Sequence, residues 1–218
     1  FALPGCSSQT WEQVKGCLGQ EVLRPEEFEL GQAFQANFSA AQYADAFERI
    51  QDYIQAGDCY QVNLAQRFSS RYSGDPLSAY LRLRKNIRSP FAGFMRTSNS
   101  AVLSFSPERF IQVRGAQVLT QPIKGTRPRS ADPVRDQALA QELRESDKDR
   151  AENLMIVDLL RNDLGTICVT GSIKVEQLFE LHSFSNVHHL ISSIRAQLAP
   201  EHAALDLLRN CFPGGSIT

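Results

Sequence analysis

Four short segments of the sequence hold side chains that can do acid–base, nucleophilic or ion-binding chemistry. In the first segment, Glu108 follows Pro107 and precedes Arg109. A proline cannot extend the ladder of a central strand, so Glu108 is expected at a junction between two strands. A carboxyl group held at such a junction can act as a general acid. The alternative is a surface glutamate that pairs with Arg109.

The second segment places three cations, Lys124, Arg127 and Arg129, close together in the chain. Gly125 lets the backbone approach a ligand closely, and Thr126 adds a hydroxyl group and an amide. Guanidinium groups suit carboxylates, and a desolvated lysine near other cations can act as a nucleophile. The segment therefore predicts an anion site, with a solvated basic loop as the alternative.

The third segment is an acidic stretch with helical periodicity. At helical spacing, Asp149, Glu152 and Asp163 project from nearly the same face. Their oxygens are of the kind that hard cations such as Mg²⁺ bind. Asp158 is interpreted as structural, because Arg161 lies three positions further on and can pair with it. A charged, solvated helix surface is the alternative for the whole stretch.

The remaining candidates are a pair of histidines and a pair of glycines. Neighbouring residues of a strand point to opposite faces, so His188 and His189 are not expected to share one metal ion. One of them can face a cleft as a hydrogen-bond donor, and a core histidine is the alternative. Gly214 and Gly215 suit a backbone nest for a carboxylate, although a plain turn fits equally well.

The composition is that of a soluble globular protein. Of the 218 residues, 42% are hydrophobic and 22% are charged, with a net charge of −1. This balance does not favour nucleic-acid or membrane binding as the main activity, and no apolar run approaches the roughly 20 residues that cross a bilayer. The cysteine count is odd and lacks zinc or redox spacing, which favours reduced thiols in a cytoplasmic protein.

The first half of the chain mixes helix and strand patterns. Ser39 and Gln42 form a capping box that begins a helix ending at Gly57. Asp75 and Pro76 begin a second helix. Strands are expected at 59–68, 91–96, 101–105, 109–114 and 117–121, and the turn residues between the last four indicate a meander.

The second half predicts an alternation of helices and strands that completes an α+β fold. Antiparallel β-sheets with covering helices are expected. The elements are a helix over 146–164, short strands at 167–169 and 172–175, a buried helix or strand over 187–196, and a helix over 203–211. Residues 1–38 are weakly patterned and are expected to be a linker or a remnant of an N-terminal region. Because both ends look cut, the chain is expected to be a piece of a longer protein.

Taken together, five motifs resemble the chorismate-binding enzymes, a family that includes the anthranilate, aminodeoxychorismate, isochorismate and salicylate synthases. The motifs occupy residues 57–64, 106–110, 122–126, 149–163 and 213–218, in the order of the family. The resemblance implies the fold of that family. It also implies that residues 39–218 are the N-terminal portion of its catalytic domain, truncated at the C-terminal end.

Within this family, Lys124 resembles the aminodeoxychorismate synthase branch, since anthranilate synthases carry alanine at this place. The resemblance implies that Lys124 attacks chorismate and forms a covalent intermediate, which ammonia then displaces. Glu108 would be the general acid and base for the departing hydroxyl group. A glutamine amidotransferase subunit would supply the ammonia, and the product would lead to 4-aminobenzoate and folate.

The resemblance also implies the other site residues. Glu152 would bind Mg²⁺, and the substrate contacts would come from Gly125, Thr126, His189, Gly214 and Gly215. The residues Pro90, Phe91 and Ala92 resemble a segment that binds tryptophan. Because the family continues past Thr218 with further ligands, the 218 residues alone are expected to be inactive. Anthranilate synthase chemistry and a non-catalytic domain that binds tryptophan or chorismate are the alternatives.

Overall fold

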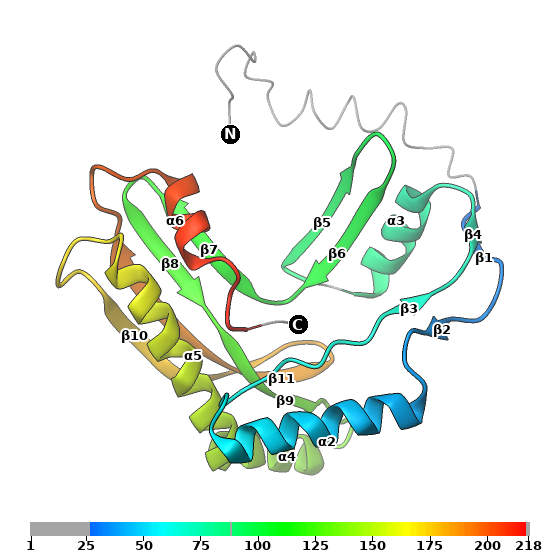
Figure 1. The fold of residues 1–218 in the computed structure, drawn as a ribbon, viewed down its shortest axis with the longest axis horizontal. Helices are drawn as coiled ribbons and strands as arrows, with labels where there is room; N and C mark the ends of the chain where they lie inside the picture. The colour runs from blue at the N-terminus through cyan, green and yellow to red at the C-terminus, as the bar shows by residue number, and fades with distance from the viewer. Residues whose placement is uncertain (1–26, 88, 217–218) are drawn as a thin grey trace. The chain divides into compact units, whose positions relative to one another are not determined.

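The computed structural model describes residues 27–87 and 89–216. The chain divides into two compact units. The first comprises the chain up to Ile87 together with Phe94–Leu103, and the second comprises Arg88–Gly93 with Ser104–Thr218. Helices and antiparallel strands occur together (Figure 1), which confirms the predicted α+β class. Among the described residues, no helix has the length and apolar character needed to span a membrane.

Two helices dominate the first unit, and both confirm the sequence prediction. Helix α2 (Ala40–Ala56) begins at the capping box of Ser39 and ends at Gly57, whose φ of 81° is left-handed. Helix α3 (Pro76–Asn86) begins at Asp75, whose side chain caps the first turn. In each case a side-chain oxygen accepts a hydrogen bond from a backbone amide that would otherwise have no partner, and this contact fixes where the helix starts.

Four strands of the first unit pair over only two residues each. Strand β1 (Glu29–Leu30) pairs with β4 (Tyr72–Ser73), and β2 (Gln35–Ala36) pairs with β3 (Phe68–Ser69). The strand predicted over 59–68 is wrong. Its residues alternate in polarity, but the ladder with β2 reaches only Phe68, and polarity alone does not make a strand without a partner.

Strands β5 (Phe91–Arg96) and β6 (Ala101–Ser106) form a hairpin as predicted. A second hairpin follows it, formed by β7 (Arg109–Arg114) and β8 (Gln117–Gln121). The two hairpins do not continue into one meander, because β6 and β7 belong to different sheets. The link between them contains Pro107, which lacks the amide hydrogen that a continuous ladder would use.

A five-stranded antiparallel sheet forms the centre of the second unit. Besides β7 and β8 it contains β9 (Ile123–Pro128), β10 (Lys174–Ser183) and β11 (Val187–Gln197). Strand β10 pairs along one edge of β11, whereas β9 and β8 pair in turn along its other edge. Pro122 separates β8 from β9, so one stretch of chain supplies two strands along the same neighbour.

The sheet decides three expectations. The segment 187–196 is a strand, and most of the segment 121–129 belongs to strands rather than to a solvated loop. The short strand predicted at 167–169 is wrong, because Cys168 makes only a single bridge with Leu198. The strand predicted at 172–175 is confirmed only at its end, where β10 begins at Lys174 and continues to Ser183. Pairing there depends on β11, which is distant in sequence, so the local pattern does not define the strand ends.

Three helices cover the second unit's sheet and its neighbours. Helices α4 (Pro133–Glu145) and α5 (Asp147–Gly165) pack against β9 and β11, and α6 (Ala204–Cys211) packs against α5 (Figure 1). Helix α4 was not predicted, although Asp132 and Pro133 form a standard start signal. The buried core between α5, α6 and the sheet includes Val118, Ile156, Val157, Leu160, Leu164, Ile194 and Leu207. Burial of these side chains fixes α5 against the sheet.

Candidate active site

Glu108 lies in the link between β6 and β7, as the sequence predicts. Its half-buried carboxylate accepts two hydrogen bonds, one from the Ile123 amide at 2.9 Å to Oε1 and one from the Ser216 hydroxyl at 3.0 Å to Oε2. Arg109 donates instead to the Gln121 side chain at 2.9 Å. The alternative of a surface Glu108–Arg109 pair is therefore wrong. The carboxylate is oriented by donors from two distant parts of the chain.

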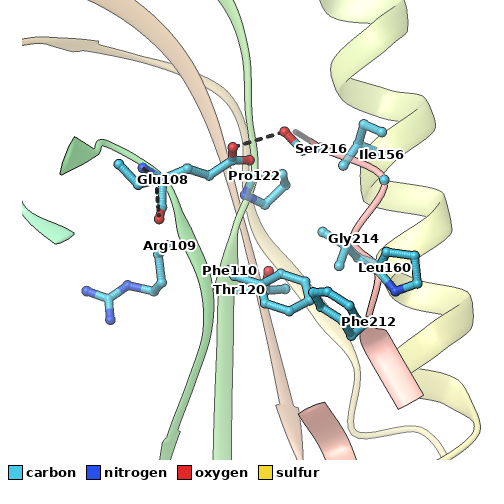
Figure 2. A pocket seen from close by; sticks show the side chains of 13 residues that line it. Glu108, Arg109, Phe110, Thr120, Pro122, Ile156, Leu160, Phe212, Gly214 and Ser216 are labelled. Carbon is cyan, nitrogen blue, oxygen red and sulfur yellow. Dashed lines mark hydrogen bonds between the residues drawn. The ribbon is translucent and has the colours of Figure 1, made fainter. Parts of the chain in front are cut away.

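The Glu108 carboxylate lies on the wall of a cavity of about 380 Å³. Figure 2 shows Glu108 turned toward Ser216, with the rings of Phe110 and Phe212 further along the cavity. The lining is Ser106, Glu108, Arg109, Phe110, Thr120, Pro122, Ile156, Leu160 and residues 212–216. A mostly apolar cavity with few converging polar groups is the usual form of a small-molecule site.

Gly214 and Gly215 line this cavity and pack tightly against its walls. A Cβ atom on Gly214 would lie 2.9 Å from a ring carbon of Phe110, and one on Gly215 would collide with Leu159 Cδ2. A side chain at either position would therefore require Phe110 or Leu159 to move. The close approach keeps the Gly214–Gly215 backbone next to the space where a ligand would lie, and the carboxylate nest stays a prediction.

Lys124 lies at a β-bulge in strand β9. In the ladder with β11, Lys124 and Gly125 together face the single residue Leu190. Gly125 has a φ of 90°, a left-handed conformation that favours glycine at a bulge. Bulges redirect side chains and are frequent beside active sites. Among the residues that the structure describes, none forms an ion pair or hydrogen bond with the half-buried Lys124 side chain.

The two arginines of the predicted anion site are paired within the protein. Arg127 donates to Glu142 at 2.7 Å and to Asp149 at 3.1 Å, and these carboxylates raise the pKa of Arg127. Arg129 pairs with Asp136 at 2.8 Å, and this guanidinium holds the pKa of Asp136 well below its usual range. Both guanidinium groups are thus occupied by the protein's own carboxylates, which leaves Lys124 as the candidate for a reacting cation.

His189 is buried in β11 beside the Lys124 bulge. Its Nδ1 lies 2.9 Å from the Thr126 hydroxyl, and its ring meets the edge of Phe184. Burial lowers the pKa of His189, while a hydrogen bond with the Gly125 backbone acts in the opposite direction. A neutral imidazole can both donate and accept a proton. His188 has different partners, so the two histidines do not share a site, as predicted.

Glu152, the predicted magnesium ligand, lies in α5 with a partly exposed side chain 3.6 Å from Lys148 Nζ. The other two acidic residues predicted on this helix face are in different surroundings. Asp149 is paired with Arg127, and burial raises the pKa of Asp163. Within the described residues there is no group of three or more His, Cys, Asp or Glu side chains that could hold a metal. A single carboxylate still suits Mg²⁺, which often keeps water and substrate oxygens as its other ligands.

Pro90 and Phe91 line a second cavity, of about 180 Å³. Arg109 and Phe184 also line it, and the Arg109 guanidinium lies 4.8 Å from the centre of the Phe91 ring. A guanidinium stacked on an aromatic ring offers both charge and an apolar surface. Ala92, the third residue of the predicted tryptophan segment, is not part of this lining.

The structure gathers the predicted residues in two adjoining places. Glu108 lies at the large cavity with Gly214 and Gly215, whereas the other place is the β9–β11 ladder, which holds Lys124, Gly125, Thr126 and His189. Ile123 joins them, since its amide binds Glu108 and Lys124 is the next residue. The sequence reasoning missed the role of Ser216, for which the signal was a hydroxyl residue directly after the glycine pair.

The comparison with protein families decides the assignment. The model of the family "chorismate binding enzyme" matches residues 5–218 of the chain. The chain belongs to the chorismate-binding enzyme family. This membership agrees with the resemblance of the five motifs. It also agrees with a cavity whose wall holds a carboxylate and a glycine pair.

Two similar members of the chorismate-binding family show how much of a relative the chain covers. Aminodeoxychorismate synthase component 1 of Escherichia coli is 52% identical over 199 residues, which cover 91% of this chain and 44% of that protein. Anthranilate synthase component 1 of Streptomyces coelicolor is 39% identical over 188 residues, or 86% of this chain and 37% of that protein. The chain thus spans less than half the length of these curated relatives.

The solved structure of anthranilate synthase component I from Streptococcus pneumoniae has the same fold. It superimposes with a TM-score of 0.75 at 32% identity, covering 94% of this chain and 47% of that chain. The antiparallel sheet with its covering helices is therefore the chorismate-binding fold, as the sequence predicts.

Proposed function

We propose that the full-length protein is an aminodeoxychorismate synthase, in which Lys124 and Glu108 convert chorismate and ammonia into 4-amino-4-deoxychorismate. The observation that carries the proposal is the link through Ile123. The Ile123 amide binds the Glu108 carboxylate, and Lys124 is the next residue in the chain. A proton donor and an amine nucleophile are thereby tied to one stretch of backbone. The name of the 52% identical relative supports the same reaction.

In the proposed reaction, the Lys124 amine forms a bond to C2 of chorismate while the bond between C4 and its hydroxyl oxygen breaks. Both ring double bonds shift along the path from C2 through C1, C6 and C5 to C4, so that the electron pair of the new bond at C2 is balanced by the pair that leaves with the C4 oxygen. Glu108 delivers a proton to the leaving oxygen, so that water departs, because hydroxide is a poor leaving group. Ammonia then bonds to C4, the bond between C2 and the lysine nitrogen breaks, and Lys124 is released. An amine nucleophile thus divides one difficult displacement into two easier ones.

The other predicted residues have supporting roles in this proposal. Glu152 would hold Mg²⁺, which would neutralise a substrate carboxylate when bound. Substrate contacts would come from Gly125, Thr126, His189, Gly214 and Gly215. The buried His189 remains neutral over most of the physiological range, because burial lowers its pKa. It is therefore suited to hydrogen bonding with the substrate rather than to charge pairing.

Two partners belong to the proposal. A glutamine amidotransferase subunit would supply ammonia in a cytoplasmic enzyme, and the product would serve 4-aminobenzoate and folate synthesis. The smaller cavity at Pro90 and Phe91 is the candidate place for L-tryptophan. An indole ring suits the apolar wall there, and the Arg109 guanidinium suits its carboxylate. Neither partner changes the assignment of Lys124 and Glu108.

A second candidate function is anthranilate synthesis from the same substrate. The relative from Streptomyces coelicolor and the solved structure from Streptococcus pneumoniae carry that name. Lys124 argues against it, since the resemblance assigns lysine at this place to the other branch. The two reactions release different products and are therefore separated by direct analysis.

The test uses the full-length protein with chorismate, Mg²⁺ and ammonium, and separates the products by chromatography. We expect 4-amino-4-deoxychorismate, and anthranilate as the main product would overturn the proposal. In Lys124→Ala the turnover number should fall about 100-fold or more, because the nucleophile is removed. Lys174→Ala, at an exposed position in β10, is the matched control and should retain wild-type turnover. Normal turnover in Lys124→Ala would favour a non-catalytic role for this segment.

A further inference from the structure

Asn153 is the most completely buried polar side chain of α5, with a relative exposure of 0%. Its Nδ2 donates to the Leu190 carbonyl at 3.2 Å, and its Oδ1 accepts a hydrogen bond from the Ser192 hydroxyl. A carbonyl can only accept, so the Leu190 contact fixes which end of the amide faces the sheet. Both ends of this side chain are therefore satisfied at defined positions of β11.

The first partner of Asn153 is the residue that faces the Lys124 bulge. Leu190 lies opposite both Lys124 and Gly125 in the β9–β11 ladder. Gly125 also touches α5 directly, since a Cβ atom on it would lie 2.9 Å from the Cβ of Asp149. Asp149 and Asn153 are one helical turn apart, so both lie on the face of α5 that meets the sheet. Helix α5 thus contacts both strands at the level of the bulge.

The second partner of Asn153 leads to another bulge, on the other edge of β11. In the β10–β11 ladder, Leu178 and Phe179 together face the single residue Ser192. The Phe179 amide donates to the Ser192 hydroxyl at 3.1 Å, and that hydroxyl donates to Asn153. Phe179 has a φ of 56°, a conformation that residues other than glycine avoid, so the surrounding contacts must hold it there.

A third contact ties the Phe179 bulge to the same helix. The Arg150 guanidinium of α5 lies 5.1 Å from the centre of the Phe179 ring. Two bulges on opposite edges of one strand, each with a residue at positive φ, are therefore connected to α5 within a single turn. Fully satisfied buried polar networks of this kind specify one arrangement, because alternative registers leave donors and acceptors unpaired.

We infer that Asn153 is a positioning residue, whose side chain holds the Lys124–Gly125 bulge and the Phe179 bulge in one fixed register with helix α5. Glu152 precedes Asn153 in that helix, so the same contact sets the distance between the proposed nucleophile and the proposed magnesium ligand. The kinetic part of this inference rests on the proposed function, whereas the structural part does not. Asn153 itself is not expected to touch the substrate.

The test compares three variants of the full-length protein. Asn153→Leu keeps a similar volume but removes both hydrogen bonds, and Ser192→Ala removes only the hydroxyl that links Asn153 to Phe179. Leu164→Ala is the control, because Leu164 is equally buried in α5 but lies three turns away from Asn153 in the core. It should lower the melting temperature without disturbing either bulge.

The first measurement is amide hydrogen exchange. In Asn153→Leu, exchange in residues 124–126 and 178–180 should accelerate about 10-fold or more relative to wild type, since these amides lose the register that protects them. In Leu164→Ala these two segments should keep wild-type exchange relative to the rest of the sheet. Wild-type exchange at both segments in Asn153→Leu would overturn the inference. If Asn153→Leu does not fold, the test uses Ser192→Ala. Faster exchange in residues 178–180 of that variant would support the inference, and wild-type exchange there would overturn it.

The second measurement is steady-state kinetics with chorismate and ammonia. In Asn153→Leu, kcat should fall about 10- to 100-fold while the KM for chorismate changes less than about 3-fold, as expected when a nucleophile is misplaced and binding is retained. The Mg²⁺ concentration that gives half-maximal activity should rise in the same variant. If the kcat of Asn153→Leu equals that of Leu164→Ala, the kinetic part of the inference is overturned. Absence of aminated product from wild type would instead refute the proposed function, and hydrogen exchange would still decide the structural part.

Discussion

The Glu108 carboxylate accepts the backbone amide of Ile123 at 2.9 Å. Fifteen positions separate the two residues in the sequence. Through this hydrogen bond the link between β6 and β7 is fastened to the first residue of β9. The position of the proposed proton donor is therefore set by the strand that carries the proposed nucleophile, and disturbance of either one is expected to affect the other.

The Glu108 contact predicts a loss of turnover without a loss of fold. In Glu108→Gln, the side-chain carbonyl can still accept the Ile123 amide and the new NH₂ group can donate to Ser216, so the melting temperature should stay near the wild-type value. The amide cannot transfer a proton, so kcat with chorismate and ammonia should fall by about 10²- to 10⁴-fold. Glu201→Gln, at an exposed position, is the control. Wild-type kcat in Glu108→Gln would exclude Glu108 as the general acid.

The bulge glycine predicts a loss of stability that depends on backbone conformation. Gly125→Ala should lower the free energy of unfolding by about 1–3 kcal/mol, because alanine is strained at positive φ and its Cβ would press on Asp149 and Leu143. Urea denaturation measures the change. Gly93→Ala is the matched control, since a Cβ there has no neighbour within 4 Å and φ is not positive. Equal effects of the two substitutions would contradict the bulge interpretation.

His189 predicts a dependence of stability on pH. Burial lowers the pKa of His189 below 6.5, the ordinary value of a histidine. The unfolded chain therefore binds a proton more readily than the folded one. The contribution of neutral His189 to the free energy of unfolding is fully present above the pKa that His189 has in the unfolded chain. It is lost as the pH falls through that value toward the lower pKa of His189 in the folded protein.

The corresponding measurement is the free energy of unfolding between about pH 8 and pH 5. The wild-type protein should lose stability toward the acid end more steeply than His189→Gln, in which the titrating group is absent. His202→Gln, a substitution in the loop before α6, should retain the wild-type slope. A His189→Gln profile parallel to that of the wild type would show that His189 does not titrate with a lowered pKa.

The ion pair of Arg127 and Asp149 predicts that two aspartates of α5, one buried and one exposed, contribute differently to stability. Asp149→Ala leaves the mostly buried Arg127 guanidinium without one of its two carboxylate partners and should destabilise the fold by about 1–3 kcal/mol. Asp158→Ala breaks an exposed pair with Arg161 and should cost less than about 1 kcal/mol. Thermal unfolding of the two variants checks the order. A larger effect at Asp158 would contradict the conclusion that the more buried Arg127–Asp149 pair contributes more to stability.

Much of the fold was open to prediction because its signals are local. Ser39 and Gly57 mark the ends of α2, and Asp75 marks the start of α3, since caps act through their own backbone neighbours. Asp158 was correctly assigned to Arg161, which is one turn away in the same helix. The family was recognisable from five motifs for a similar reason, because their order and wording are properties of the chain itself.

The tertiary structure alone decided how those motifs meet. The conformation of the Lys124 segment depends on β11, which follows it by more than sixty residues, so no local pattern shows that it is a strand with a bulge. Arg127 and Arg129 resembled ligand-binding cations in the sequence, yet folding brings carboxylates of α4 and α5 to them. The sequence by itself determined which chemical groups are present. Long-range pairing and burial determined which of them stay available, because a charge is neutralised by whichever partner the fold places beside it.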